Sequence, residues 1–493
     1  MQTSSTGGPG PPRIQSGAGS CHARPLAWLL ALAVACAAPA PREPDKPEVV
    51  LSTPAVDRKV GEEASEDIAS QFGLVDEPEL SAYVSGLGRR LAVHAPGHDF
   101  DYEFQIVDED PPNAFALPGG FIYVSRGLLT LSNSEDELAN VLAHEIVHVY
   151  ARHAAGRQTV EQNVPGPFQM LAGGFFARYS RDQEREADSA GQSLAAAAGY
   201  DPQGMAEFLR DLEFTERLEF GASRLPTFFD THPPTAERAA AAAARARSIT
   251  WQRQPGATSE RIGYLRRLEG LTVGMSASEG VFQGDRFLHP DLDFSLRFPD
   301  GWELHNTRLA VGAISPQRDA QVFLMHQGPG SDPEVAAAEY LEEIRARGFR
   351  PDEVQPIKIG DLAAYRASGG AGSPAGPISV VLTWIAYNDS IYRLTGSGTG
   401  RTSKRHLGTF INVARSFRPL TELLRRSIHE TRLHITTARE GESLGQLGER
   451  MQNEWDVQRT AVMNDLFANQ PLAAGQLVKV AVSHLYEPTP DAR

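Results

Sequence analysis

The chain has 493 residues, of which 41% are hydrophobic and 22% charged, so it is long enough for two to four domains with substantial cores. Its 47 Lys and Arg residues against 62 Asp and Glu residues give a formal net charge of −15, which argues against a nucleic-acid partner. The two cysteines, Cys21 and Cys36, both lie near the N-terminus, which excludes a disulfide framework and a cysteine-ligated zinc ribbon. Any later metal site must therefore use His and carboxylate side chains.

Residues 1–36 have the pattern of a signal peptide. The apolar run PLAWLLALAVA, at residues 25–35, is too short to span a bilayer but suits the core of a secretory signal. The small residues before Cys36 resemble the lipobox of bacterial lipoproteins, in which that cysteine is lipidated. We expect a periplasmic protein held to the outer membrane by a lipid on Cys36 alone; the alternative is a cleaved signal and a soluble secreted protein.

The remainder divides by composition. Residues 37–56 are rich in Pro and charge and read as a linker. Residues 57–250 are mainly helical, with helices predicted over 135–153 and 181–198, and residues 251–285 form a connector.

Residues 286–418 carry several strand-like runs, a turn at Asn388-Asp389 and one clear helix, VAAAEYLEEIRARG. They predict an independent α+β domain with an antiparallel sheet, whose outline is similar to PsbP-like domains. Since this stretch has no catalytic cluster, we interpret it as a packing or partner-docking domain.

Residues 428–485 read as strand, helix, helix and strand, an order that resembles the LysM module. LysM modules usually bind N-acetylglucosamine polymers, so the segment predicts contact with peptidoglycan; a cap that docks onto protein is the alternative. The expected fold class is thus α+β multidomain: a mainly helical domain with a small sheet, an α+β antiparallel-sheet domain and a small LysM-like βααβ module.

The chemically informative motif is His144-Glu145-Ile146-Val147-His148, an HExxH sequence. It lies in a predicted helix that opens with the capping-box pattern Ser134-Glu135-Asp136-Glu137. Four steps of about 100° place His144 and His148 on one helical face, so both imidazoles can reach one metal ion. Glu145 projects beside them, where it can take a proton from water that such a metal acidifies.

A third protein ligand is needed to complete a catalytic zinc site. His153 has the wrong spacing for the third histidine of a metzincin, and a continuing helix would place it opposite His144, so we interpret it as a structural or surface residue. Glu184 and Asp188 are better candidates, because they share one helical face: one carboxylate can bind the metal while the other orients an imidazole. Glu186 points elsewhere, and an ordinary charged helix surface is the alternative for this run.

Four motifs in order carry a family resemblance: NAFALPGGFIYVSRGLL at 113–129, HEIVH at 144–148, SRDQEREAD at 180–188 and THPPTAER at 231–238. Together they resemble the gluzincin metallopeptidases of family M48. The periplasmic BepA-like branch fits better than the membrane-embedded HtpX-like and CAAX-protease branches, because no transmembrane segment follows the signal.

The resemblance implies one zinc ion per chain, held by His144, His148 and Glu184. It makes Glu145 the general base and acid, and Asp188 the residue that orients a ligand.

The same resemblance brings His232 to the metal, where it either stabilises the tetrahedral oxyanion or plugs the fourth coordination position. Arg238 would fix the pocket. Asn113, Ala114 and Phe115 would form an edge strand along which an extended polypeptide substrate adds as a β-strand.

The loop 155–179 joins the two predicted metal-binding helices, and it reads as a mobile flap over the cleft or as a packing loop. The expected function is a zinc-dependent endopeptidase of the bacterial cell envelope that acts on extended or misfolded proteins. The alternative is a catalytically latent, chaperone-like or scaffold lipoprotein that works through its C-terminal modules.

Overall fold

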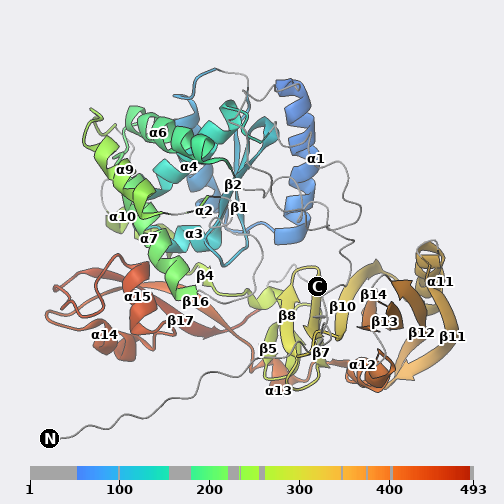
Figure 1. The fold of residues 1–493 in the computed structure, drawn as a ribbon. Coiled ribbons are helices and arrows are strands. Elements are labelled where there is room, and N and C mark those ends of the chain that lie inside the picture. Colours follow the sequence, from blue (N-terminus) through green and yellow to red (C-terminus); the bar gives the residue numbers. More distant parts are fainter. Residues whose placement is uncertain are drawn as a thin grey trace, which may run out of the picture.

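The computed structural model describes residues 53–97, 100–154, 179–219, 232–233, 235–254, 261–345, 348–373, 376–399 and 403–488. The predicted signal peptide with Cys36, most of the linker and nearly all of the loop 155–179 lie outside these residues. Among the residues that are described, no helix is both long and apolar enough to cross a membrane. Figure 1 shows a helical N-terminal part above two later parts that are rich in strands.

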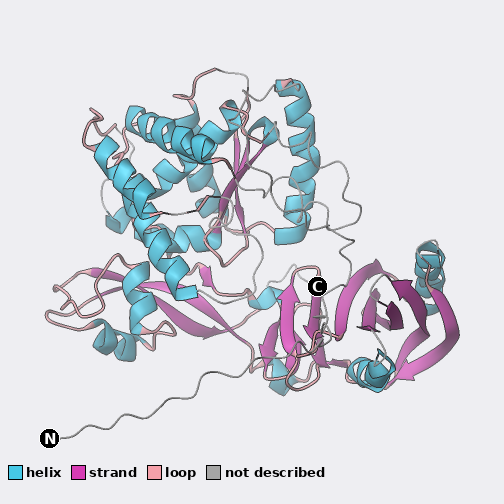
Figure 2. Cartoon of the chain, in the orientation of Figure 1, coloured by secondary structure: helices cyan, strands magenta, loops and turns pink. Residues whose placement is uncertain are grey.

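The helical part surrounds a small three-stranded sheet (Figure 2). Its elements are α1 (Pro54–Phe72), α2 (Pro78–Ala92), β1 (Glu103–Val107), β2 (Ala114–Leu117), β3 (Phe121–Ser125), α3 (Arg126–Leu131), α4 (Glu135–Tyr150), α6 (Arg181–Ala197), α7 (Gly204–Glu219), α9 (Ala236–Ala246) and α10 (Arg261–Leu265). The strand order is β1-β3-β2, with β1 parallel and β2 antiparallel to β3. Among the described strands, β2 therefore forms an edge of the sheet.

Helix α4 runs through the core of this part. Ser134 caps it by accepting a hydrogen bond from the backbone N–H of Glu137, at 3.1 Å, which confirms the predicted helix start. The Glu137 carboxylate accepts from the backbone N–H of Asn133, at 2.8 Å, and so completes the cap one residue earlier than a capping box would. Nearly every side chain from Glu135 to Val149 is buried, so α4 is surrounded by protein on all sides.

Helix α6 packs against α4 and brings the acidic motif to it. Ser180 and Gln183 form a reciprocal capping box at its start. At Gly191 the two backbones approach closely: a Cβ atom there would lie 3.0 Å from the backbone nitrogen of His144, which is tighter than ordinary van der Waals contact. The absence of a side chain at this position lets the carboxylates of α6 reach the histidines of α4.

The second part contains two antiparallel sheets. Its elements are β5 (Val281–Gln283), β6 (Arg286–His289), β7 (Phe294–Arg297), β8 (Glu303–Thr307), β9 (Ala310–Ile314), β10 (Ala320–Pro329), α11 (Pro333–Arg345), β11 (Arg350–Ile359), β12 (Leu362–Ser373), β13 (Gly376–Tyr387), β14 (Ser390–Thr399), α12 (Leu407–Arg415), β15 (Arg418–Pro419) and α13 (Glu422–Arg425). The strand orders are β11-β12-β13-β14-β10-β9-β8 and β15-β7-β6-β5. The predicted turn at Asn388 and Asp389 is confirmed, because both residues have positive φ angles, 48° and 54°, in the β13–β14 hairpin.

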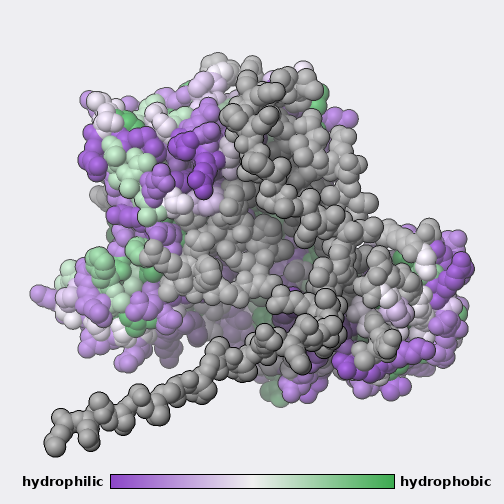
Figure 3. Space-filling view, in the orientation of Figure 1, coloured by the Kyte–Doolittle hydropathy of each residue, from purple (hydrophilic) through white to green (hydrophobic). Residues whose placement is uncertain are grey.

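A core of aromatic residues lies between these sheets. Phe294 stacks on Phe417 with ring centroids 4.8 Å apart, and Tyr392 packs against both rings. In the face shown in Figure 3, the described surface is mostly hydrophilic, with hydrophobic residues in small separate patches. This distribution is typical of the surface of a globular protein.

The third part contains β16 (His429–Thr437), α14 (Leu444–Met451), α15 (Val457–Met463) and β17 (Leu477–Leu485), in the predicted order of strand, helix, helix and strand. Strand β16 pairs with β17 and also with β4 (Thr272–Val273), which lies in the predicted connector. Leu433 of β16 and Ala481 of β17 belong to the same hydrophobic core as α4. The third part is therefore packed onto the helical part.

Lys479 is the main polar anchor of this contact. Its side chain is fully buried, and Nζ donates to the backbone carbonyls of Thr130, Leu131 and Ser132 at 2.7, 3.1 and 3.0 Å. These carbonyls lie at the C-terminal end of α3, where helical carbonyls lack partners within their own helix. A protonated amine has three N–H donors, so each donor has one acceptor.

Candidate metal centre

Helix α4 places His144 and His148 on one face, as the spacing predicts. Their Nε2 atoms lie 3.0 Å apart, and both side chains are only 1% exposed. Two imidazole nitrogens at this separation point toward a common position, which suits a shared cation.

Helix α6 contributes two carboxylates. The oxygens of Glu184 lie 3.7 Å from His148 Nε2 and 3.8 Å from His144 Nε2. Asp188 lies on the other side of the His144 ring, with Oδ1 3.2 Å from Nδ1. Glu184 thus faces the position between the two Nε2 atoms, where a cation would lie. Asp188 instead contacts Nδ1, the opposite nitrogen of the His144 ring.

His232 comes from a distant part of the chain and enters the same cluster. Its Nδ1 atom lies 2.8 Å from Glu184 Oε1 and 3.2 Å from His144 Nε2. One ligand atom from each of His144, His148, Glu184 and His232 lies within 4.8 Å of all the others.

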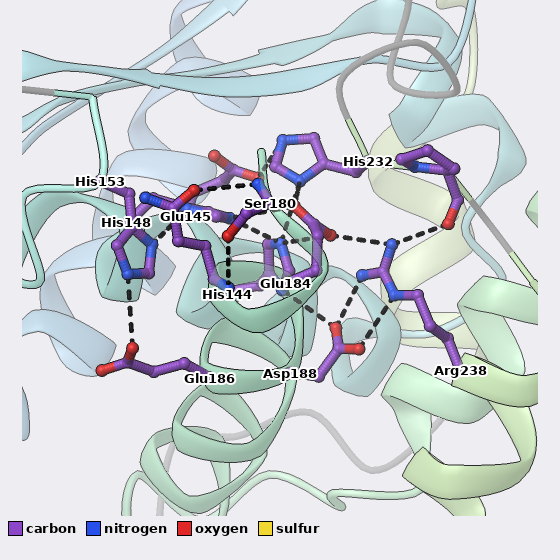
Figure 4. A network of polar contacts seen from close by, with 12 residues as sticks. His144, Glu145, His148, His153, Ser180, Glu184, Glu186, Asp188, His232 and Arg238 are labelled. Carbon is purple, nitrogen blue, oxygen red and sulfur yellow. Dashed lines mark hydrogen bonds and ion pairs between the residues drawn. The ribbon is translucent and has the colours of Figure 1, made fainter. Parts of the chain in front are cut away.

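Arg238 contacts both carboxylates of this cluster, Asp188 and Glu184. Its guanidinium donates to both oxygens of Asp188, at 2.9 and 2.7 Å, and lies 2.8 Å from Glu184 Oε2. It also donates to the backbone carbonyl of Pro233, at 3.0 Å, which fixes the chain next to His232. Figure 4 shows Arg238 beside Asp188 and Glu184 at the edge of the cluster.

Glu145 is fully buried beside the ligands. Within the described part of the chain, neither of its carboxylate oxygens has a hydrogen-bond partner. The imidazole of His232 lies beside it, with Nε2 3.7 Å from Glu145 Oε1. Burial raises the pKa of the Glu145 carboxyl, against the opposing effects of His232 and His144.

For the other ionisable groups of the cluster, burial shifts the pKa in one direction and the neighbouring charged groups shift it in the other. Burial acts to lower the pKa of His144, but the hydrogen bond to Asp188 and the charge of Glu184 raise it on balance. Burial acts to raise the pKa of Asp188, but His144 and Arg238 hold it well below its usual range. Burial also opposes ionisation of Glu184, yet His232 and Arg238 lower its pKa.

The residues present fit a zinc ion. Imidazole nitrogen and carboxylate oxygen are its common protein ligands, and three protein ligands with one further position describe a catalytic site. The cluster offers converging lone pairs and a buried carboxylate without hydrogen bonds, which a bound cation and its water would satisfy.

The prediction for His153 is wrong in its position. Helix α4 ends at Tyr150, Arg152 adopts a left-handed conformation with φ of 57°, and the backbone N–H of His153 donates to the carbonyl of His148 at 3.0 Å. The chain therefore turns back, and His153 is 6% exposed with Nδ1 2.8 Å from His148 Nδ1. Neither Gly nor Pro marks this turn, so the sequence carries no signal for it.

Tyr179 is a second residue that the motifs did not indicate. Its ring stacks on His148 with centroids 3.8 Å apart, and it also lies 4.9 Å from the ring of His232. Tyr179 immediately precedes the cap of α6, so the start of that helix places an aromatic wall against the cluster.

The predicted substrate strand lies at the edge of the small sheet. Asn113 donates its backbone N–H to Ser125 Oγ, at 2.8 Å, and its carbonyl accepts from the backbone N–H of Ser125, at 2.7 Å. Both backbone groups of Asn113 therefore face β3. Because strand residues alternate, the backbone groups of Ala114 and Ala116 point away from β3, toward the edge that pairs with no described strand, whereas those of Phe115 face β3 like those of Asn113. All of these β2 residues are buried.

A buried HExxH helix, a glutamate from a second helix and an adjacent sheet edge define an HExxH metallopeptidase domain. Residues 75–246 match the profile described as peptidase family M48, and this domain of the chain belongs to that family.

Curated relatives share this region. The chain is 32% identical over 203 residues to the beta-barrel assembly-enhancing protease of Escherichia coli K12, a match that covers 36% of this chain and 41% of that protein. It is 28% identical over 200 residues to the mitochondrial metalloendopeptidase OMA1 of Schizosaccharomyces pombe, covering 37% of this chain and 58% of that protein. The chain thus spans less than two thirds of the length of these relatives.

Among solved structures, that of cyanobacterial PsbP from Synechocystis aligns with 28% of this chain and 95% of its own length, at 10% identity and a TM-score of 0.25. A TM-score this low supports no conclusion about the PsbP-like outline predicted for residues 286–418.

Proposed function

We propose that the protein is a zinc-dependent endopeptidase of the bacterial cell envelope that hydrolyses peptide bonds in extended or misfolded proteins. The observation that carries the proposal is the convergence of His144, His148, Glu184 and His232 beside a buried Glu145. The names of the relatives, a beta-barrel assembly-enhancing protease and a mitochondrial metalloendopeptidase, support peptide hydrolysis.

One zinc ion would be held by His144 Nε2, His148 Nε2 and the Glu184 carboxylate. When bound, zinc would acidify a water molecule and polarise the carbonyl of the scissile peptide. Asp188 accepts the Nδ1–H of His144, which leaves the lone pair on Nε2 for the metal. Arg238 holds Asp188 and Glu184 in this arrangement.

Glu145 would act as general base and then as general acid. Its carboxylate takes the proton of the attacking water and returns it to the nitrogen of the leaving amine. Burial raises its pKa, which brings the group closer to the range in which it can both accept and donate a proton near neutral pH.

His232 has the geometry of a plug in the described conformation. Its contacts with Glu184 and His144 place the ring where a water or a substrate carbonyl would otherwise approach the ligands. Stabilisation of the oxyanion, the other predicted role, requires His232 to move out of this position. We therefore propose that the described conformation is a resting state, closed by His232.

An extended substrate would pair with the edge of β2. The alternation of the strand assigns its main-chain hydrogen bonds to Ala114 and Ala116, with Asn113 and Phe115 supporting the strand from the inner side. Phe115 stacks on Tyr123 with centroids 5.0 Å apart, which fixes the strand against α1 and β3.

We propose that the protein lies in the periplasm, with a lipid on Cys36 as its only attachment to a membrane.

We also propose that residues 428–485 contact peptidoglycan. The loop between α15 and β17 offers Phe467, which is 82% exposed, as a surface for such contact. A pull-down on purified peptidoglycan should use the full chain, because Leu433 and Ala481 lie in the core shared with α4; Phe467→Ser would release the protein if this loop binds glycan.

A latent scaffold or chaperone-like protein is the second candidate function. It is favoured by the complete burial of His232 and Glu145, which leaves the described site closed to a polypeptide. In this case the work would fall to the later parts of the chain.

Degradation of an unfolded protein separates the two functions. The native chain should degrade it and Glu145→Gln should not, while His232→Ala should be faster if the histidine is a plug. Equal degradation by the native chain and Glu145→Gln would exclude the peptidase function. Zinc content is measured first: about one equivalent is expected in the native chain, with loss in His144→Ala. Substrates can then be trapped on Glu145→Gln.

A further inference from the structure

His153 is held against the candidate metal centre by a turn that costs backbone energy. Arg152, a residue with a side chain, adopts a left-handed conformation that normally favours Gly or Asn. Its guanidinium donates to the Asp57 carboxylate on α1, at 2.7 Å, and this contact holds the turn in place. The result is a buried His153 whose ring stands beside His148, with ring centroids 4.9 Å apart.

The contact between the two rings, together with the proposed binding of zinc by His148, assigns the protons to particular nitrogens. His148 Nε2 faces His144 and Glu184, so it must keep a lone pair to bind a cation. The proton of a neutral His148 then lies on Nδ1, which is 2.8 Å from His153 Nδ1. His148 is therefore the donor, and His153 accepts through Nδ1.

This assignment leaves the proton of His153 on Nε2. That nitrogen faces Glu186 Oε2 at 3.6 Å (Figure 4). Glu186 lies between Glu184 and Asp188 on α6. This one helix therefore supplies Glu184, which faces the proposed zinc position, and Glu186, which contacts His153 behind the ligand His148.

We propose that His153 is a positioning residue for His148, with Glu186 at the outer end of the chain His148–His153–Glu186. This proposal rests on the proposed zinc site and deepens it. His144 is held directly by a charged carboxylate, Asp188, whereas His148 is held by a neutral ring. Such partners fix the tautomer and the orientation of a ligating imidazole, and their removal typically weakens metal binding about 10- to 100-fold.

The test compares zinc affinity in the full chain and its variants, by competition with a chromogenic chelator at constant pH. His153→Leu removes the acceptor and should weaken zinc binding about 10- to 100-fold. His153→Asn retains an oxygen acceptor near the position of Nδ1 and should restore affinity to within about threefold of the native chain. Glu186→Gln should weaken binding by about two- to fivefold, while Asp182→Asn, on the exposed side of the same helix, should leave it unchanged.

A second measurement does not depend on any variant being folded. In the zinc-loaded native chain labelled with ¹⁵N-histidine, long-range ¹H–¹⁵N correlations should show His148 protonated on Nδ1 and His153 protonated on Nε2. A proton on Nδ1 of His153 would overturn the proposal. Native zinc affinity in a folded His153→Leu chain would overturn it while leaving the zinc site intact, whereas a native chain that binds no zinc would overturn the proposed function as well.

Discussion

The metal-site cluster, His144, Glu145, His148, Glu184 and His232, can be compared with a second buried polar cluster around Lys479. The first lies in the core of the helical part and the second where the third part packs onto it, and both combine groups from distant parts of the chain. Around Lys479 each N–H donor has its own carbonyl acceptor. In the metal-site cluster, three imidazoles and a carboxylate converge on each other, and Glu145 has no hydrogen-bond partner among the described residues.

This contrast shows that the burial of a charged group does not by itself mark a functional site. A buried polar group with satisfied hydrogen bonds stabilises the fold, since its removal leaves partners without bonds. A buried group that lacks partners costs stability, and it persists where a ligand or a reaction uses it. Four substitutions test this distinction.

Glu145→Gln should have the largest effect on activity and little effect on the fold. We expect kcat/KM for peptide hydrolysis to fall about 10³-fold or more, because the amide cannot accept a proton. The melting temperature of the metal-free chain should rise or stay the same, since a neutral amide costs less to bury than a carboxylate without partners. Zinc content should be unchanged. A melting temperature several degrees lower would break the comparison, and Asp182→Asn on the surface of α6 serves as the control.

Lys479→Met should have the opposite effect to Glu145→Gln: it should lower stability and leave zinc binding unchanged. The substitution leaves three buried carbonyls at the C-terminal end of α3 without their donor, and we expect the free energy of unfolding to fall by about 3 kcal/mol. The folded fraction should still bind zinc with native affinity. Urea denaturation followed by zinc titration tests both statements, with Lys404→Met at an exposed position as the control. Selective loss of zinc affinity in a stable Lys479→Met chain would contradict the assignment.

Gly191→Ala should weaken the metal site by changing the distance between α4 and α6. The added Cβ would lie 3.0 Å from the backbone nitrogen of His144, so α6 must shift by a few tenths of an ångström. We expect zinc affinity to fall about tenfold, the range seen when groups that orient ligands are displaced. Gly86→Ala is the matched control, because its Cβ would meet only the end of the Arg90 side chain, at 3.8 Å. That control should stabilise α2 by about 0.5–1 kcal/mol.

Glu109→Gln should give the smallest effect, on the pH dependence of stability. Burial raises the pKa of Glu109 to about 7, although Asn113 donates to its carboxylate at 3.3 Å. The folded chain therefore holds a proton that the unfolded chain releases near pH 4.5, so the contribution of Glu109 is full below pH 4.5 and is lost as the pH rises through about 7.

Because the Glu109 side chain is partly exposed, we expect a loss of about 1 kcal/mol between pH 5 and 8, and this loss should be absent in Glu109→Gln. Melting temperatures measured in 0.5-unit steps of pH would show it. The same pH slope in both chains would contradict the assignment to Glu109.

Much of the site could be predicted because the relevant patterns are local. The helix start at Ser134 follows from a local capping pattern and the placement of His144 and His148 from helical periodicity, and both are present in the structure. The Asn388-Asp389 hairpin turn is local in the same sense.

What could not be predicted depends on contacts between distant residues. His153 was misplaced because its turn is held by Asp57, 95 positions from Arg152, and by no local Gly or Pro. The packing of residues 428–485 onto the helical part depends on Lys479, which reaches carbonyls 347 to 349 positions away. Such contacts leave no periodic signal in the sequence.

Residue types and spacing were sufficient to predict the class of chemistry, because the lack of cysteine after Cys36 left only His and carboxylate ligands and because helical periodicity placed two histidines on one face. How these groups are partnered depends on the tertiary fold. It brought His232 into contact with Glu184 and His144, turned His153 toward His148, and left Glu145 without a hydrogen bond among the described residues. The physical reason is that residue type and periodicity act within a helix, whereas burial and hydrogen bonding depend on which helices meet.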